Sequence, residues 1–310
     1  QRRGAEMRAV VDDPALLDLT GSDPSRVRTV AWIIGSTFAA LSGVLIAPFL
    51  GLDAGLLTLL VVQAFGAVAI GRFGSLPLTY VGGLVLGVGA SLLTKWVAGE
   101  PALAGLPSSL PFLVLFLVLV IRPPAMVRGH AAPPVTEVGR RRELSGPVRI
   151  AGGAAAVAVV LALPEIAGAK LPTFTSAAGF VIVFVSLALL VRTSGQISLC
   201  HATFGAVGAT AFTHFGSSSG LGLPWFVALV LAGLAVVPIG AVVAIPAIRL
   251  SGLHLALATF GFAILMERVG YPSGLMFGAG GFREAPRPSF ARSDTAFFYV
   301  TTVVVAVACG

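Results

Sequence analysis

A run of polar side chains inside an apolar stretch carries the most informative chemistry in this chain. Residues Ser194–Ala209 read SGQISLCHATFGAVGA. On a helix, steps of three and four residues would place one stripe on a single face, and its members are Ser198, His201, Gly205, Gly208 and Phe212. Two interpretations stay open for this run. One is helix packing alone, with His201 a satisfied interior histidine, and the other is a substrate path near Gln196, Ser198 or His201.

Small residues form a second stripe at helical spacing, at Gly83, Gly87, Ala90 and Thr94. Small side chains allow membrane helices to approach each other closely. We interpret Gly83 and Gly87, together with Gly205 and Gly208, as helix-packing positions rather than as substrate contacts.

Several kinds of catalytic site are missing from the sequence. A phosphate-binding P-loop needs Gly-Lys followed by Ser or Thr, but Lys95 follows Thr94 and Lys170 follows Ala169. A zinc-protease helix carries two histidines, the first of which is followed by Glu. The four histidines of this chain are scattered, and none is followed by Glu. We therefore expect no catalytic residue, no metal site and no bound cofactor in this chain.

The composition is that of a membrane protein. Hydrophobic residues make up 56% of the chain and charged residues 11%, whereas soluble domains carry about 25% charged residues. The mean hydropathy is +0.97. The net charge of +7 comes largely from arginines in short segments between apolar runs, which is typical of membrane loops. A nucleic-acid partner is not expected.

Apolar segments long enough to cross a bilayer follow one another along the chain. Crossing ~30 Å of hydrocarbon takes about 20 residues of helix. We expect an all-α, polytopic membrane helix bundle of about nine to ten spans. The expected spans are Thr29–Leu50, Gly55–Ile70, Pro77–Val97, Pro107–Ile121, Val148–Ala167, Phe174–Val191, Ile197–His214, Trp225–Ile248 and Leu253–Val269, with a tenth starting near Thr295.

Two polar stretches divide the apolar segments. We predict a cytoplasmic segment over 1–28, a first membrane region over 29–122, a polar linker over 123–147 with the triplet Arg140–Arg142, and a second membrane region over 148–310. The chain starts at Gln1 and stops inside an apolar run. We therefore expect it to be an interior part of a longer protein.

Arginine and lysine predict the orientation. If 1–28 is cytoplasmic and each span crosses once, 14 of the 20 basic residues lie inside. The six on the other side are Lys95, Lys170, Arg268, Arg283, Arg287 and Arg292. This asymmetry follows the positive-inside rule.

Carboxylates avoid the middle of the expected spans, and the two that fall within spans, Glu165 and Glu267, lie near a span end. Proton-driven carriers usually keep Asp or Glu inside the membrane. The pattern therefore argues against a secondary carrier, although that class and a purely structural membrane subunit remain alternatives.

The second membrane region resembles a known family. The Ser194–Ala209 run is similar to the SGQ-SLGHA-FxGxGAY motif of the M-type permease subunit of branched-chain amino-acid ABC importers. Ala247–Thr259, AIRLSGLHLALAT, is similar to that subunit's alRlrGlYfAlaT pattern, and Gly278–Gly281 follows where the family has T-G-G. The resemblance covers about 148–310.

The first region resembles the H-type subunit of the same importers. Met7–Asp23, MRAVVDDPALLDLTGSD, is similar to that family's mRAvaqdpelArllGid, and Gly71–Gly83, GRFGSLPLTYVGG, to its GGlGSlpGavlGG. Ile121–Pro124 matches its basic, proline-containing tail. Arg72 stands where the family has Gly. The chain thus looks like the back part of one subunit fused to the front part of its partner.

The resemblance implies a permease in the bacterial plasma (inner) membrane that imports leucine, isoleucine or valine. Relatives that carry urea, short amides or other amino acids leave these cargoes as alternatives. The implied partners are two ATPase subunits, which would hold ATP and Mg²⁺, and a periplasmic or lipid-anchored binding protein. Met7–Asp23 would be the coupling segment that docks on an ATPase, and an ordinary membrane-surface loop is the alternative. Its implied contact residues are Arg8, Asp12, Asp13, Leu16, Leu17 and Asp18.

Overall fold

The computed structural model describes residues 2–51, 53–100, 103–121, 146–218, 220–250, 252–278 and 280–309. All regular structure within these ranges is helical. The described chain forms two compact units, Gln1–Val62 and Gln63–Gly310. The predicted linker over 123–147, including Arg140–Arg142, lies almost entirely outside the described residues.

Three helices and the first part of a fourth make up the first unit. They are α1 (Arg2–Asp12), α2 (Pro14–Leu19), α3 (Pro24–Leu50) and the start of α4 (Ala54–Ile70). Buried Val10 and Leu17 lie where α1 and α2 pack together. Pro14 suits the first turn of α2, where its missing N–H costs nothing, whereas the few apolar residues of α1 form no recognisable stripe.

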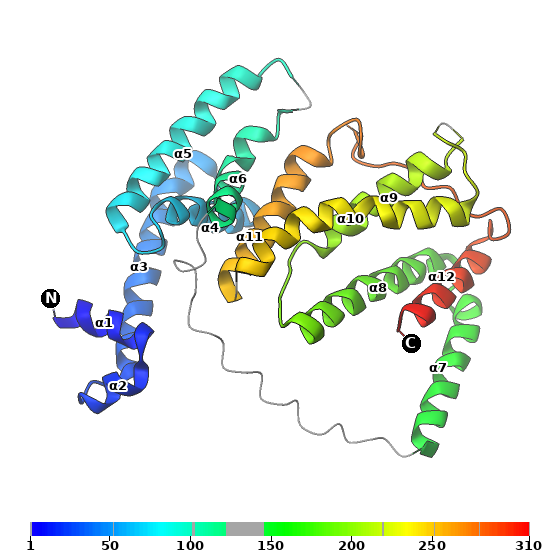
Figure 1. Ribbon diagram of the computed structural model, residues 1–310, viewed down its shortest axis with the longest axis horizontal. Coiled ribbons are helices and arrows are strands. Elements are labelled where there is room, and N and C mark those ends of the chain that lie inside the picture. The colour runs from blue at the N-terminus through cyan, green and yellow to red at the C-terminus, as the bar shows by residue number, and fades with distance from the viewer. Residues whose placement is uncertain are drawn as a thin grey trace. The chain divides into compact units, whose positions relative to one another are not determined.

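The second unit holds the remaining helices, shown in cyan to red in Figure 1. They are α5 (Leu76–Val97), α6 (Leu106–Ile121), α7 (Gly146–Ala167), α8 (Leu171–Ser194), α9 (His201–Gly216), α10 (Trp225–Arg249), α11 (Gly252–Leu265) and α12 (Asp294–Cys309). A 3-10 turn, η3 (Gly168–Lys170), joins α7 to α8, and a π-helical turn, η4 (Met266–Gly270), extends α11.

A helix lies at each predicted span, and the fold class is confirmed. By length and composition, five described segments could cross a membrane: Pro24–Phe49, Leu76–Val97, Ala151–Ser194, Trp225–Ile245 and Gly252–Gly270. The helices α4, α6 and α12 are shorter, at 17, 16 and 16 residues. They reach only about 24–26 Å. The described chain is therefore an all-α, multi-pass membrane protein.

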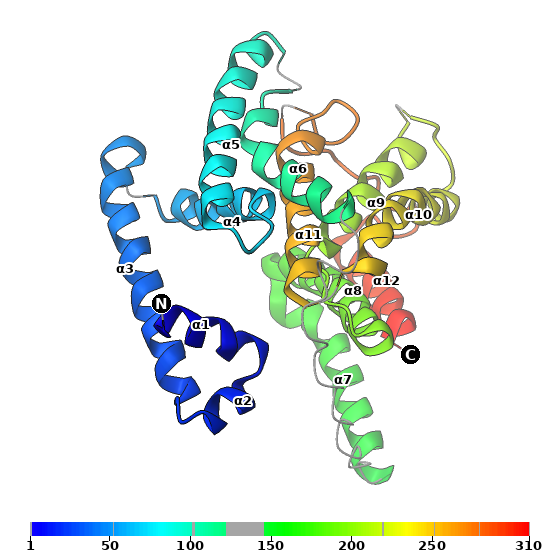
Figure 2. The same cartoon turned by 60° about the vertical axis from the view of Figure 1, so that its left-hand side comes forward.

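Both consecutive helices and helices distant in sequence pack side by side in the second unit. The yellow-green α9 lies along the yellow α10, and α8 lies along α12, in both views (Figures 1 and 2). The helix α6 packs on α11. Leu115 and Leu119 of α6 are buried in one cluster with Leu255 and Ala258 of α11.

The close contact between α5 and α4 is made by Gly82 and not by the predicted stripe residues Gly83 and Gly87. A Cβ at Gly82 would lie 2.9 Å from the carbonyl oxygen of Ala67, whereas one at Gly87 would meet nothing within 4 Å and one at Gly83 only Ala67 at 3.9 Å. On α9, Gly208 faces Val236 of α10, and Gly205 faces open space. Packing at Gly83, Gly87 and Gly205 stays a prediction.

Candidate functional site

The polar run singled out in the sequence lies at a break between two helices. The helix α8 ends at Ser194, Gly195 takes a left-handed conformation with φ 66°, and α9 begins only at His201. The residues between them are not helical. Irregular backbone at membrane depth is tolerated where it is buried in protein or lines a cavity. The expected helix from Ile197 is therefore wrong over its first turn, and Ser198 lies in the loop rather than on a stripe of α9.

Two hydrogen bonds fix this loop to neighbouring helices. The side-chain amide of Gln196 donates to the carbonyl oxygen of Ala247 in α10 at 2.9 Å. The backbone N–H of Leu199 donates to Oγ1 of Thr259 in α11 at 3.0 Å. The second bond gives the Leu199 N–H the partner that the interrupted helix cannot supply, and the first gives a partner to one of the last carbonyl groups of α10. The loop is thereby held across the gap between α10 and α11.

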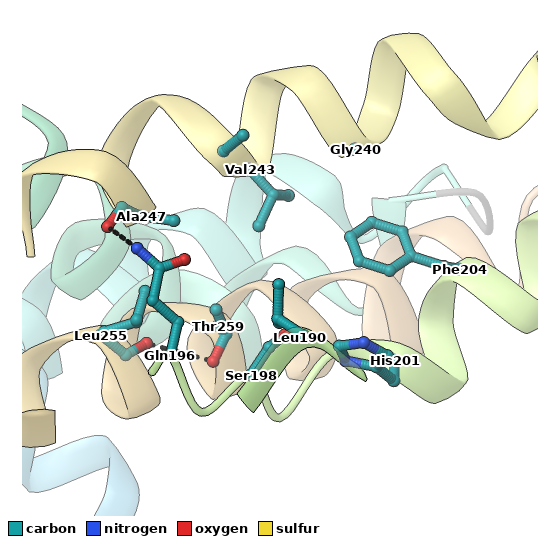
Figure 3. Close-up of a pocket in the computed structure, with 11 residues that line it drawn as sticks. Leu190, Gln196, Ser198, His201, Phe204, Gly240, Val243, Ala247, Leu255 and Thr259 are labelled. Carbon is teal, nitrogen blue, oxygen red and sulfur yellow. Dashed lines mark hydrogen bonds between the residues drawn. The ribbon is translucent and has the colours of Figure 1, made fainter. Parts of the chain in front are cut away.

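A cavity of about 180 Å³ lies beside this loop. Four polar residues line it, from the loop, α9 and α11: Gln196, Ser198, His201 and Thr259. The rest of the wall comes from α8, α9, α10 and α11 and consists of Leu190, Phe204, Gly240, Val243, Ala244, Ala247 and Leu255. Figure 3 shows Gln196 reaching from the loop to α10, with its amide oxygen turned away from Ala247.

His201 has a nitrogen without a hydrogen-bond partner in the described part of the chain. Its Nδ1 atom is shielded from solvent. The imidazole meets the ring of Phe204 edge-on, with 6.1 Å between centroids. A buried polar atom without a partner calls for an explanation in a native structure. Because Nδ1 is shielded, a ligand in the adjoining cavity would meet other atoms of the imidazole ring and not this nitrogen.

The cavity is suited to binding rather than to covalent chemistry. Its wall is mostly apolar, and its polar groups are a few amide, hydroxyl and imidazole atoms, as in sites for small molecules. Cys200, the nearest nucleophilic type, is fully buried and its Sγ lies 3.3 Å from the Ser198 hydroxyl. The arrangement can hold a small, largely aliphatic molecule that has a polar end.

The structure brings together the three residues predicted for a substrate path. Gln196, Ser198 and His201 all line the cavity. Sequence reasoning missed Thr259 and Gly240. Thr259 ends the second family motif, which is a signal that the sequence did contain, whereas Gly240 lies in an apolar run with no distinguishing pattern.

The predicted coupling residues lie on the first unit. Asp13 caps α2, because its Oδ1 accepts hydrogen bonds from the backbone N–H groups of Ala15 and Leu16 at 2.9 and 3.1 Å. The side chain of Leu17 is only 5% exposed, whereas Leu16 is 60% exposed. Leu17 thus packs inside the unit, so any contact with a partner falls to its exposed neighbours. Arg8, Asp12 and Asp18 are exposed.

Known proteins resemble the first part of the chain. Residues 2–121 match the family described as branched-chain amino acid transport system / permease component. The high-affinity branched-chain amino acid transport system permease protein LivH of Salmonella typhimurium is 32% identical over 129 residues, which are 39% of this chain and 38% of the relative. The corresponding protein BraD of Pseudomonas aeruginosa is 32% identical over 123 residues, with the same coverage.

A probable branched-chain amino acid transport permease protein LivH of Methanocaldococcus jannaschii is 25% identical over 95 residues, which are 31% of this chain and 30% of the relative. The chain thus spans well under half the length of these curated relatives. No solved structure matches. The predicted H-type resemblance of the first region is confirmed, while the M-type resemblance of the second region and the fusion stay predictions.

Proposed function

We propose that this chain, which over residues 2–121 is related to permease components of branched-chain amino acid transport, is a transmembrane permease component of an ATP-driven importer of leucine, isoleucine and valine. The family match carries the proposal. Several apolar helices of membrane length support it, and the location that it implies is the bacterial plasma (inner) membrane.

The cavity between α8, α10 and α11 lies on the substrate path in this proposal. Its apolar wall suits an aliphatic side chain, and the Gln196 amide oxygen and the imidazole of His201 suit the polar end of an amino acid. A charged pair such as a zwitterion needs such groups because its desolvation is costly. Ser198 and Thr259 hold the loop in the shape that presents them.

In this proposal, ATP hydrolysis by separate subunits supplies the energy for transport. Two ATPase subunits would bind ATP and Mg²⁺ and contact the segment of α1 and α2. The exposed side chains of Leu16 and Leu19, 60% and 84% exposed, offer an apolar contact, with Arg8 and Asp18 at its rim. A binding protein would deliver the amino acid from the other side of the membrane.

Reconstitution in liposomes tests the proposal. The permease would be combined with the ATPase subunits and the binding protein of the same genome, and uptake of labelled leucine would be measured with and without ATP inside the liposomes. We expect ATP-dependent uptake, and loss of most of it when Gln196→Ala and His201→Ala are combined. A matched pair of exposed changes, Thr94→Ala with Ser176→Ala, should leave uptake intact.

Two outcomes would contradict the proposal. Uptake driven by a proton gradient without ATP would identify a secondary carrier. ATP-dependent uptake of urea or acetamide in place of leucine would keep the permease class and replace the cargo.

A further inference from the structure

Gly240 stands out in the cavity wall because it contributes no side chain there. It lies on α10 one turn before Val243 and Ala244, so the three residues share the face that lines the cavity. A Cβ built on Gly240 would meet nothing within 4 Å. The first carbon of a side chain at this position would therefore contact no other part of the protein.

The neighbouring wall has large side chains where Gly240 has none. Figure 3 shows Gly240 on the α10 ribbon above Phe204 of α9, with Val243 pointing toward the loop. Phe204 and Val243 line the same cavity as Gly240. A side chain at this position would compete directly with the body of a ligand.

The volume of the cavity sets the scale of that competition. A dry apolar cavity of about 150 Å³ holds benzene, and one water occupies about 30 Å³ in the liquid. The cavity of about 180 Å³ therefore suits a molecule slightly larger than benzene. An isopropyl group at residue 240 adds three carbon atoms, which would take up about half of that space.

We propose that Gly240 is the residue that sets the upper size limit for the aliphatic side chain of the transported amino acid. The inference rests on the proposed function and adds the specificity determinant to it. The polar end of the ligand lies near Gln196 and His201, and its side chain occupies the volume that Gly240 leaves open. Enlarging residue 240 then excludes four-carbon side chains while still admitting the single methyl group of alanine.

Uptake of leucine and alanine by the reconstituted importer tests this inference. We expect Gly240→Val to lower the ratio of leucine to alanine uptake by about tenfold or more, since one methylene in an apolar pocket changes selectivity by about 10–200-fold. Gly240→Ala should give a smaller change in the same direction. Gly233→Val is the matched control, because Gly233 lies on the same helix, is exposed and also faces open space.

The outcomes separate the inference from the proposed function. An unchanged ratio in Gly240→Val, with normal uptake by the wild-type importer, would overturn the inference and leave the function standing. Absence of uptake of both amino acids by the wild type would overturn the function itself. If Gly240→Val fails to elute as a single species while Gly233→Val does, Gly240→Ala decides the question, and an unchanged ratio there overturns the inference.

An independent measurement does not need transport. Gly240→Cys in a Cys309→Ser background places an accessible thiol in the cavity, while Cys200 stays fully buried. We expect leucine to slow the modification of Cys at position 240 by a small maleimide several-fold, and to leave the same thiol at position 233 unaffected. Equal rates with and without leucine at position 240 would contradict the placement of the ligand.

Discussion

Gly105, just before α6, faces the carbonyl oxygen of Arg268 in η4 so closely that any Cβ would overlap it. The contact is between two backbones, so no side-chain rotation can relieve the overlap. We expect Gly105→Ala to lower the midpoint of thermal unfolding in detergent, because overpacking costs about 1–3 kcal/mol. Gly87→Ala is the control, since its Cβ would meet open space; an equal loss there would show that the contact with Arg268 is not the cause.

Thr259 holds the loop between α8 and α9 through a single hydroxyl. Its Oγ1 accepts from the backbone N–H of Leu199. Thr259→Val keeps the shape and leaves that N–H without its partner, which costs about 1–3 kcal/mol when the group is buried. We expect faster hydrogen exchange at residues 196–200 in Thr259→Val and wild-type exchange in Thr259→Ser. Unchanged exchange in both variants would mean that the loop is held by other contacts.

The sequence predicts part of this site because polar residues in an apolar run are rare and visible. Gln196, Ser198 and His201 are found in that way. Gly240 cannot be found in that way. Its proposed role depends on having no side chain in a cavity whose other walls include residues more than thirty positions earlier, such as Phe204. Such a relation appears only once α9 and α10 are seen side by side.

At the scale of single elements, α2 depends on its cap. The helix has only six residues, and isolated helices of that length are unstable in water. We expect Asp13→Ala to increase hydrogen exchange over residues 15–19, because loss of an N-cap costs about 0.5–2 kcal/mol. Asp13→Asn preserves a side-chain oxygen and should restore protection. If the alanine variant retains full protection, packing of Leu17 alone stabilises the helix.

The turn between α4 and α5 explains one feature of the family pattern. Arg72 and Phe73 have φ values of 61° and 53°, in the left-handed region that favours glycine. The H-type pattern that this segment resembles has Gly where this chain has Arg72. Phe73 has this conformation as well, and its ring packs edge-on against the ring of His254 in α11 at a centroid distance of 4.8 Å. Propensity alone predicts the turn but not this contact, which depends on how α11 packs.

Across the whole molecule, helix positions follow from hydropathy, whereas their pairing does not. The segments predicted from apolar runs coincide with helices because each must satisfy its own backbone in lipid. Pairing instead depends on close contacts such as Gly261 of α11 with the carbonyl oxygen of Phe112 in α6, which a Cβ would approach to 3.4 Å. No periodicity in either segment identifies that partner.

The packing of α6 on α11 predicts that the two membrane regions stay together without a covalent link. A protease site inserted between residues 122 and 145 would allow the chain to be cut after purification. We expect the two fragments to co-elute in mild detergent, and Gly261→Leu to separate them by pushing α6 away. Gly179→Leu, on α8 where a Cβ meets open space, is the control. Separation of the unmodified fragments would contradict the prediction.

The three-residue connection η3 has a consequence for biosynthesis. Gly168 has φ 48°, and with its two neighbours it is all that separates α7 from α8. So short a connection leaves no polar loop to translocate on its own. The ribosome-bound insertion machinery would therefore receive α7 and α8 within one apolar segment, Ala151–Ser194, and would have to insert the two helices in close succession.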